Sequence, residues 1–346
     1  MSTRLSVVLS QGQGEHPAKR GLEEDLVTAL IMEDGVELTV VPNLYDLDAD
    51  STGILAMQSI RGPMVVVSWL YDRAARWTLD RHDVRGQNGT VLVRSDEDEP
   101  NEDEETSDSE DKLRVADERP IPSRRIYCLD LRATDHSSEF VDEIKRIARE
   151  ESTQVVGLGD WIGGNPSAEQ RARFEKPTND TAIGAMATVG SVQPIEDQPS
   201  RRWYPVIDFS RCTNCMECID FCLFGVYGVD QVDTILVEQP DNCRKGCPAC
   251  SRVCPENAIV FPQHKSPAIA GAAGETAGSL KIDLSKLFGA PDAVNTAAQE
   301  RDEQLVLAGR EAVGMEIGIP KRQATGSDQP KDELDDLIDE LDDLDI

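Results

Sequence analysis

The sequence predicts two small folded domains of different classes, an α/β domain followed by a smaller α+β domain. Strand-like and helix-like segments alternate regularly over residues 1–160, and eight of the nine cysteines fall within residues 212–254. Acidic residues are concentrated in short stretches outside both regions. At 346 residues the chain is long enough for two or three domains.

Residues 1–160 are predicted to form a small doubly wound domain with a mostly parallel sheet. Apolar, β-branched segments predict strands at 4–10, 36–41, 63–69, 126–131 and 154–158. Helical spacing of apolar residues predicts helices at 17–33, 51–60, 72–79 and 134–151. Alternating strands and helices favour a parallel sheet with helices on both faces, which binds ligands beyond the carboxyl ends of its strands.

The loop after the first predicted strand contains two glycines, Gly12 and Gly14. Such a loop can hold a phosphate at the N-terminus of the following helix. However, Pro17 occupies the position of the third glycine in the dinucleotide-binding pattern, so a plain turn is the favoured interpretation. Cys128 lies inside a predicted strand and is expected to be a buried core thiol.

The remaining cysteines form two runs of four. The first run consists of Cys212, Cys215, Cys218 and Cys222, and the second of Cys243, Cys247, Cys250 and Cys254. The first run has two, two and three residues between successive cysteines, and the second run has three, two and three, with the one extra residue before Cys247. The second run ends in Cys254-Pro255.

These spacings resemble the bacterial ferredoxin module with two [4Fe–4S] clusters, over about residues 201–263. The resemblance implies that the last cysteine of each run binds the cluster of the other run. One cluster would then be held by Cys212, Cys215, Cys218 and Cys254, and the other by Cys243, Cys247, Cys250 and Cys222. Two features depart from the family pattern: the extra residue, and Leu223 where proline is common.

Three other interpretations of the cysteines are disfavoured. Two zinc sites of four thiolates are disfavoured because structural zinc usually takes paired cysteines from separate loops. Disulfides fit poorly with the metal-like spacing. Cys243, Cys247 and Cys250 also resemble the radical-SAM triplet, but a fourth cysteine follows and only about 90 residues remain for the expected barrel.

The resemblance implies electron transfer, as an adaptor or subunit of a larger redox system with redox protein partners. With cysteine at all eight ligand positions, no iron is left open for a substrate, so a carrier is favoured over a catalyst. Two other hypotheses stay open. In the first hypothesis, the N-terminal domain binds a flavin, nucleotide or tetrapyrrole, and the clusters supply it with electrons. In the second, the chain is an assembly or regulatory protein whose clusters are structural or sensory.

The net charge of −30 is carried mainly by two short stretches. Residues 96–111 contain eleven acids and no basic residue, and residues 331–346 have a net charge of −8. A disordered acidic insertion is therefore expected at 95–120. By contrast, residues 201–262 contain six basic and eight acidic residues, and the lack of a basic footprint argues against nucleic-acid binding.

Linkers are predicted at 161–200 and 264–280, a helical segment at 281–315, and an acidic tail at 316–346. The tail carries an apolar stripe at helical spacing, which is expected to dock on a basic, grooved partner, with a solvated tail as the alternative. The stripe consists of Leu334, Leu337, Ile338, Leu341 and Leu344.

The sequence contains no long apolar run, so no membrane span is expected. The first residues lack the pattern of a cleavable signal. Because cluster chemistry suits a reducing compartment and the cysteine spacing is not disulfide-like, a cytoplasmic location is expected.

Overall fold

The computed structural model describes residues 4–14, 16–94, 113–152, 192–195, 197, 199–272, 293–314 and 317–318. The chain divides into two compact units. The first comprises Met1–Glu105, Pro120–Arg201 and Gly271–Gly274, and the second comprises Thr106–Arg119, Arg202–Ala270 and Glu275–Ile346.

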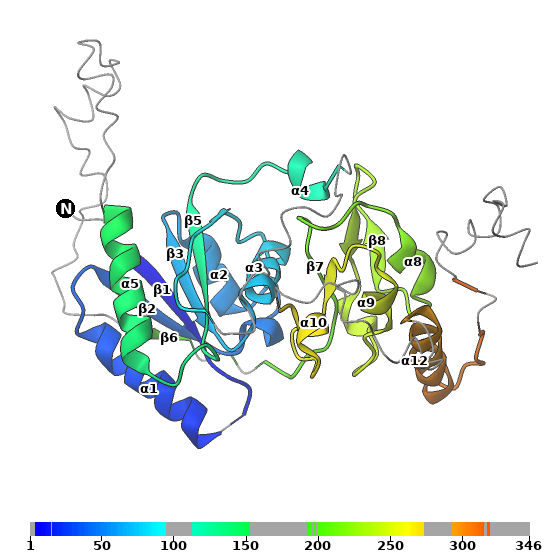
Figure 1. Cartoon of the computed structure of the whole chain (residues 1–346), viewed down its shortest axis with the longest axis horizontal. Coiled ribbons are helices and arrows are strands. Elements are labelled where there is room, and N and C mark those ends of the chain that lie inside the picture. Colours follow the sequence, from blue (N-terminus) through cyan, green and yellow to red (C-terminus); the bar gives the residue numbers. More distant parts are fainter. Residues whose placement is uncertain are drawn as a thin grey trace, which may run out of the picture. The chain divides into compact units, whose positions relative to one another are not determined.

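The first unit is built on a six-stranded sheet in the order β4-β5-β3-β1-β2-β6 (Figure 1). Every neighbouring pair of strands is parallel, which confirms the predicted parallel α/β sheet. The strands are β1 (Leu5–Ser10), β2 (Val36–Val41), β3 (Met64–Ser68), β4 (Gln87–Asn88), β5 (Arg125–Asp130) and β6 (Val192–Pro194).

Two of these strands were not predicted. β4 has only two residues, and β6 lies in the stretch expected to be a linker, where it pairs with β2 through residues such as Val192 opposite Leu38. A strand this short is stabilised by its neighbour in the sheet rather than by its own sequence pattern. The strand predicted at 154–158 lies outside the described residues.

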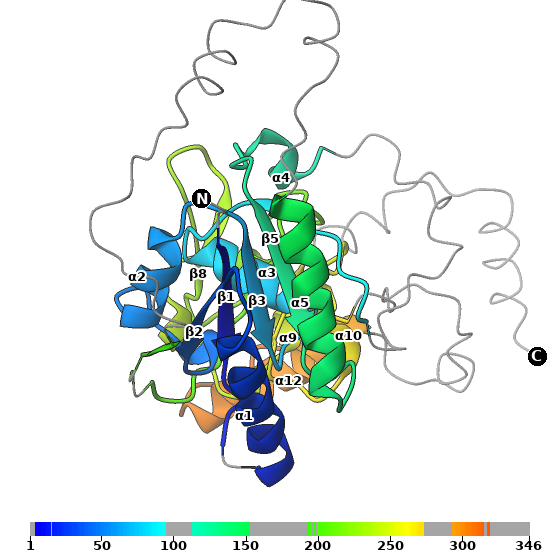
Figure 2. The same cartoon turned by 90° about the vertical axis from the view of Figure 1, so that its left-hand side faces the viewer.

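Helices cover both faces of this sheet, as the doubly wound prediction required. Figures 1 and 2 show α1 (Pro17–Ile31) and α5 (Ser137–Ser152) on one face, and α2 (Thr52–Ser59) and α3 (Asp72–Arg81) on the other. A short 3₁₀ turn, η1 (Leu44–Asp46), follows β2. Ser51 is the N-cap of α2, and its hydroxyl accepts a hydrogen bond from the Ile54 N–H.

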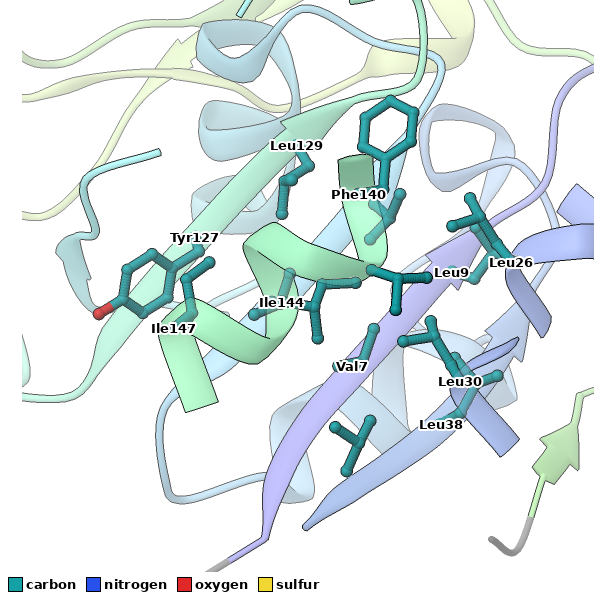
Figure 3. Close-up of a cluster of buried hydrophobic side chains, with 14 of the residues drawn as sticks. Val7, Leu9, Leu26, Leu30, Leu38, Tyr127, Leu129, Phe140, Ile144 and Ile147 are labelled. Atoms are coloured by element: carbon teal, nitrogen blue, oxygen red, sulfur yellow. The ribbon is translucent and has the colours of Figure 1, made fainter. Parts of the chain in front are cut away.

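The core between the sheet and the helices α1 and α5 is formed in part by alternate residues of the strands, because successive side chains of a strand point to opposite faces of the sheet. Alternate residues of β1, Leu5, Val7 and Leu9, point to this side. The facing helices supply apolar side chains spaced three and four residues apart, which Figure 3 shows converging on β1. They are Leu22, Leu26 and Leu30 of α1 and Phe140, Ile144 and Ile147 of α5.

The second unit contains two short antiparallel pairs in place of a single sheet. β7 (Val206–Ile207) pairs with β10 (Ile259–Val260), and β8 (Tyr227–Val229) pairs with β9 (Ile235–Val237). Two short helices, α8 (Glu217–Phe221) and α9 (Ala249–Val253), each follow a cysteine loop. The described residues of this unit therefore repeat the order strand, cysteine loop, short helix and strand.

Further short elements of the second unit lie outside that repeat. They are α4 (Val115–Glu118), η4 (Pro240–Asn242), α10 (Pro267–Ala270) and α12 (Ala293–Leu307). α12 lies within the segment 281–315 that was expected to be helical, and α10 lies within 264–280, the stretch expected to be a linker. Residues 281–292 of the segment predicted to be helical and the apolar stripe of the acidic tail lie outside the described residues.

The expectation of a disordered insertion over 95–120 does not hold for its last residues. α4 lies against the first cysteine loop, where the Val115 N–H donates to the Cys212 carbonyl at 2.9 Å. The Ala116 N–H donates to the Phe209 carbonyl at 3.0 Å. These partners are about 95 residues away along the chain, so no local pattern marks the contact. Residues 95–112 lie outside the described residues.

None of the helices among the described residues is long and apolar enough to cross a membrane.

Replacing Leu26 by alanine tests the packing of α1 on the sheet. Leu26 is fully buried, so its truncation should lower the stability of the first unit by about 2–5 kcal/mol. Leu55→Ala in α2 is the matched control, because Leu55 is 54% exposed and its loss should cost less than about 0.5 kcal/mol. Urea unfolding of the full-length chain, followed by circular dichroism, measures both; equal losses would contradict the core assignment.

Candidate functional site

The second unit contains two cavities, each lined by four cysteines. Cys212, Cys215, Cys218 and Cys254 line the first cavity, and Cys222, Cys243, Cys247 and Cys250 line the second. Each cavity thus receives three cysteines from one run and the last cysteine of the other run. The structure brings together all eight predicted site residues in these two groups, while their roles as ligands stay a prediction.

The first cysteine loop curls through two residues with left-handed backbone. Asn214 has a φ of 58° and Met216 a φ of 64°, and they flank Cys215. Asparagine tolerates this conformation better than most residues. The Asn214 side chain also anchors the loop to the β8–β9 pair, because its Oδ1 accepts from the Ile235 N–H at 2.9 Å and its Nδ2 donates to the Asp233 carbonyl at 2.8 Å.

The second cysteine loop accommodates its extra residue with a glycine. Gly246 directly precedes Cys247 and has a φ of 87°, a conformation that glycine adopts without steric cost. It occupies the same place before the second cysteine of its run as Asn214 does in the first run. Cys247 therefore still lines the second cavity together with Cys243 and Cys250.

The last cysteine of each run reaches the opposite cavity because the chain leaves the helix there. Cys222 directly follows α8 and has extended backbone, with φ −79° and ψ 106°. Cys254 directly follows α9, with φ −64° and ψ 117°. If these helices continued, Cys218 and Cys222 would share one helix face at the i, i+4 spacing. The extended backbone directs the fourth side chain elsewhere.

The cysteines lie in apolar surroundings that disfavour a bare thiolate. The second unit packs Ile207, Val226, Ile235, Ile259 and Phe261 into a buried cluster around the cysteine loops. Burial raises the thiol pKa of Cys212 and of Cys247 to about 11. Burial likewise raises the pKa of Cys218 and of Cys250 well above the ordinary value.

Hydrogen-bond donors point at three of the sulfurs. The Asn214 N–H donates to Cys212 Sγ at 3.4 Å, and the Ala258 N–H donates to Cys254 Sγ at 3.2 Å. The Tyr227 hydroxyl donates to Cys250 Sγ at 3.1 Å. Such donors favour a negatively charged sulfur, and a bound cation reverses the effect of burial because a coordinating thiol is deprotonated. The donor set therefore fits thiolate ligands of an iron–sulfur group.

The two cavities are alike in volume, about 20 Å³ each. In the part of the chain that the structure describes, no group of three or more cysteine, histidine or acidic side chains is arranged to hold a single metal ion.

Sequence reasoning missed the charged residues of these cavities. Glu217 and Glu256 line the first cavity, and Arg244 and Arg301 line the second. Glu217, Glu256 and Arg244 lie within or next to the cysteine runs, so their position in the sequence could have identified them. Arg301 belongs to α12, about 50 residues beyond the last cysteine, so no spacing rule connects it to the site.

In the first unit, the glycine loop after β1 is closed by the protein's own carboxylate. The Gly12 N–H donates to Glu23 Oε1 at 2.7 Å, and the Trp69 indole N–H donates to the same oxygen at 2.7 Å. Arg20 pairs with the other carboxylate oxygen at 2.7 Å. This bonding agrees with the plain turn favoured from sequence. The sequence did not predict this role of Glu23, because the helix that contains it was recognised from the spacing of its apolar residues alone.

Comparison with known proteins gives one informative similarity. The chain is 48% identical over 66 residues to an uncharacterized ferredoxin of Methanocaldococcus jannaschii. The match covers 19% of this chain and 44% of that protein, so the chain spans less than half the length of this relative. No family model and no solved structure matches the chain. The chain therefore contains a ferredoxin-like region.

The buried thiol of Cys128 should resist alkylation. Burial raises the pKa of Cys128 from the ordinary 9.0 to about 12, which lowers its thiolate fraction at pH 8 about 1000-fold. Iodoacetamide should thus label the peptide containing Cys128 in urea but not in the folded protein over the same period. Mass spectrometry of the digested chain measures this, and equal labelling under both conditions would refute the burial of this thiol.

Proposed function

We propose that this chain transfers electrons through two [4Fe–4S] clusters, as an adaptor or subunit of a larger redox system. One cluster is bound by Cys212, Cys215, Cys218 and Cys254, and the other by Cys222, Cys243, Cys247 and Cys250. Clusters closed by four thiolates supply one-electron chemistry without an open iron for substrate. The ferredoxin-like similarity supports this class of function.

The observation that carries the proposal is the division of each cysteine run between two cavities. A zinc site would draw its cysteines as pairs from two loops, whereas here each cavity takes three cysteines from one loop and a single one from the other. This is the ligand pattern expected of two clusters in the bacterial ferredoxin module. The contact between α8 and α9 keeps both sets of ligands in one compact body.

The other residues of the unit have supporting roles. The apolar cluster around Ile235 and Ile259 limits water at the cavities, which protects a cluster from hydrolysis and lowers the local dielectric. The Ala258 N–H and the Tyr227 hydroxyl stabilise negative charge on their sulfur partners. Both effects hold the cysteines in one geometry.

The alternative enzyme hypothesis receives no support from the β1–α1 loop. A phosphate-bearing flavin or nucleotide at this loop would meet the Glu23 carboxylate, which already accepts the Gly12 N–H. Because like charges repel, this arrangement disfavours a phosphate there. The redox partner, and docking through the acidic tail, rest on the sequence alone.

Single-cysteine variants test the shared ligands. C254A should damage the same cluster as C215A, because both residues line the first cavity, and C222A should damage the same cluster as C247A. Each variant should lose about half of the bound iron. Electron paramagnetic resonance spectra of the anaerobically purified, dithionite-reduced full-length variants make the comparison.

The spectra are compared in pairs, so each variant is the control for the others. If C254A instead matched C247A, the last cysteine of each run would serve its own run and the shared assignment would be wrong. If every variant kept the iron content of the native chain, these cysteines would be excluded as ligands.

A further inference from the structure

The two cysteine-lined cavities differ in the charges that line them. Two acids, Glu217 and Glu256, line the first cavity, and two arginines, Arg244 and Arg301, line the second. Among the described residues, no acidic side chain lines the second cavity and no basic side chain lines the first. Glu256 is paired with Arg114 at 2.9 Å, which offsets its charge, so the difference between the cavities rests on Glu217 and the two arginines.

Burial decides which of these charges matter most. Arg301 is only 2% exposed and Glu217 only 7% exposed, whereas Arg244 lies exposed on the surface. Water and salt screen an exposed charge strongly and a buried one weakly. Arg301 and Glu217 therefore dominate the difference between the cavities.

Arg301 is fixed in place by contacts within the second unit. Its guanidinium lies 4.6 Å from the ring centroid of Phe221, the residue directly before Cys222. It donates to the Ile317 carbonyl at 2.8 Å and to the Gly314 carbonyl at 2.6 Å. Its neighbour Asp302 accepts from Nε at 3.1 Å and does not line the second cavity.

The helix that carries Arg301 packs on the second cavity's side of the unit. Val294 and Ala297 of α12 share a buried cluster with Phe221, Cys247 and Val253. Arg252 of α9 pairs with Glu300 of α12 at 2.9 Å. These contacts hold α12 firmly against α9, so Arg301 cannot swing into solvent without breaking apolar packing.

We infer that Arg301 gives the second cavity the higher reduction potential of the two, and that Glu217 lowers the potential of the first. This inference rests on the proposed function. One-electron reduction adds a negative charge to a cavity, which a buried cation stabilises and a buried carboxylate destabilises.

Redox titration of the anaerobic full-length holoprotein with dithionite, followed by electron paramagnetic resonance, tests the inference. The native chain should show two resolved reduction waves. R301Q should move the higher wave to more negative potential and leave the lower wave in place, whereas R301K, which keeps the charge, should resemble the native chain. A single unresolved wave in the native chain, or an equal shift of both waves in R301Q, would overturn the inference.

Two further variants make the result specific. R310Q removes the same formal charge from an exposed arginine whose guanidinium donates to the Leu223 carbonyl at 2.8 Å, and it should move neither wave appreciably. E217Q should move the lower wave to more positive potential, so the inference stays testable if R301Q fails to fold. If E217Q moved the higher wave, the assignment of charges to cavities would be wrong.

Failure of this inference is distinguishable from failure of the proposed function. Iron and sulfide are measured on every sample before titration. A native chain without two [4Fe–4S] clusters would refute the proposed function. A chain with both clusters, whose potentials do not respond to Arg301 and Glu217 as stated, would refute the inference alone.

Discussion

The second unit depends on the point at which the chain leaves α8 and α9. At Cys222 and Cys254 the backbone becomes extended, and this change sends the last cysteine of each run to the cavity of the other run. Neither run can complete a four-sulfur site alone, so the two halves must assemble together. In a unit with short strands and a small apolar core, bound metal would then contribute directly to folding.

The unit that surrounds the cysteines extends beyond the ferredoxin-like stretch. α4 bonds to the backbone of the first cysteine loop, and α12 packs on α9 at the second cavity. Each cavity is thus supported by a segment that is distant in the sequence. Arg301 and Glu217 make the two cavities unequal, although their cysteine sets are alike. Two sites lined by the same number of cysteines can therefore differ in local charge.

The elements that were predicted from the sequence are those with a clear pattern of apolar residues within the element itself. β1, β2, β3 and β5 carry apolar, β-branched runs, and α1 and α5 carry a clear helical stripe. β6 and α4 were not predicted because both are short and are held by distant partners. The cysteine grouping came from the family resemblance, whereas Arg301 reaches the site only through the packing of α12, which no spacing pattern reveals.

Native mass spectrometry of the anaerobically purified full-length chain tests the central claim most directly, because it weighs the intact protein with everything bound to it. The account predicts a mass increase equal to about eight iron and eight sulfide atoms per chain, as two [4Fe–4S] clusters require. A chain that carries zinc without sulfide, or no metal at all, would contradict it.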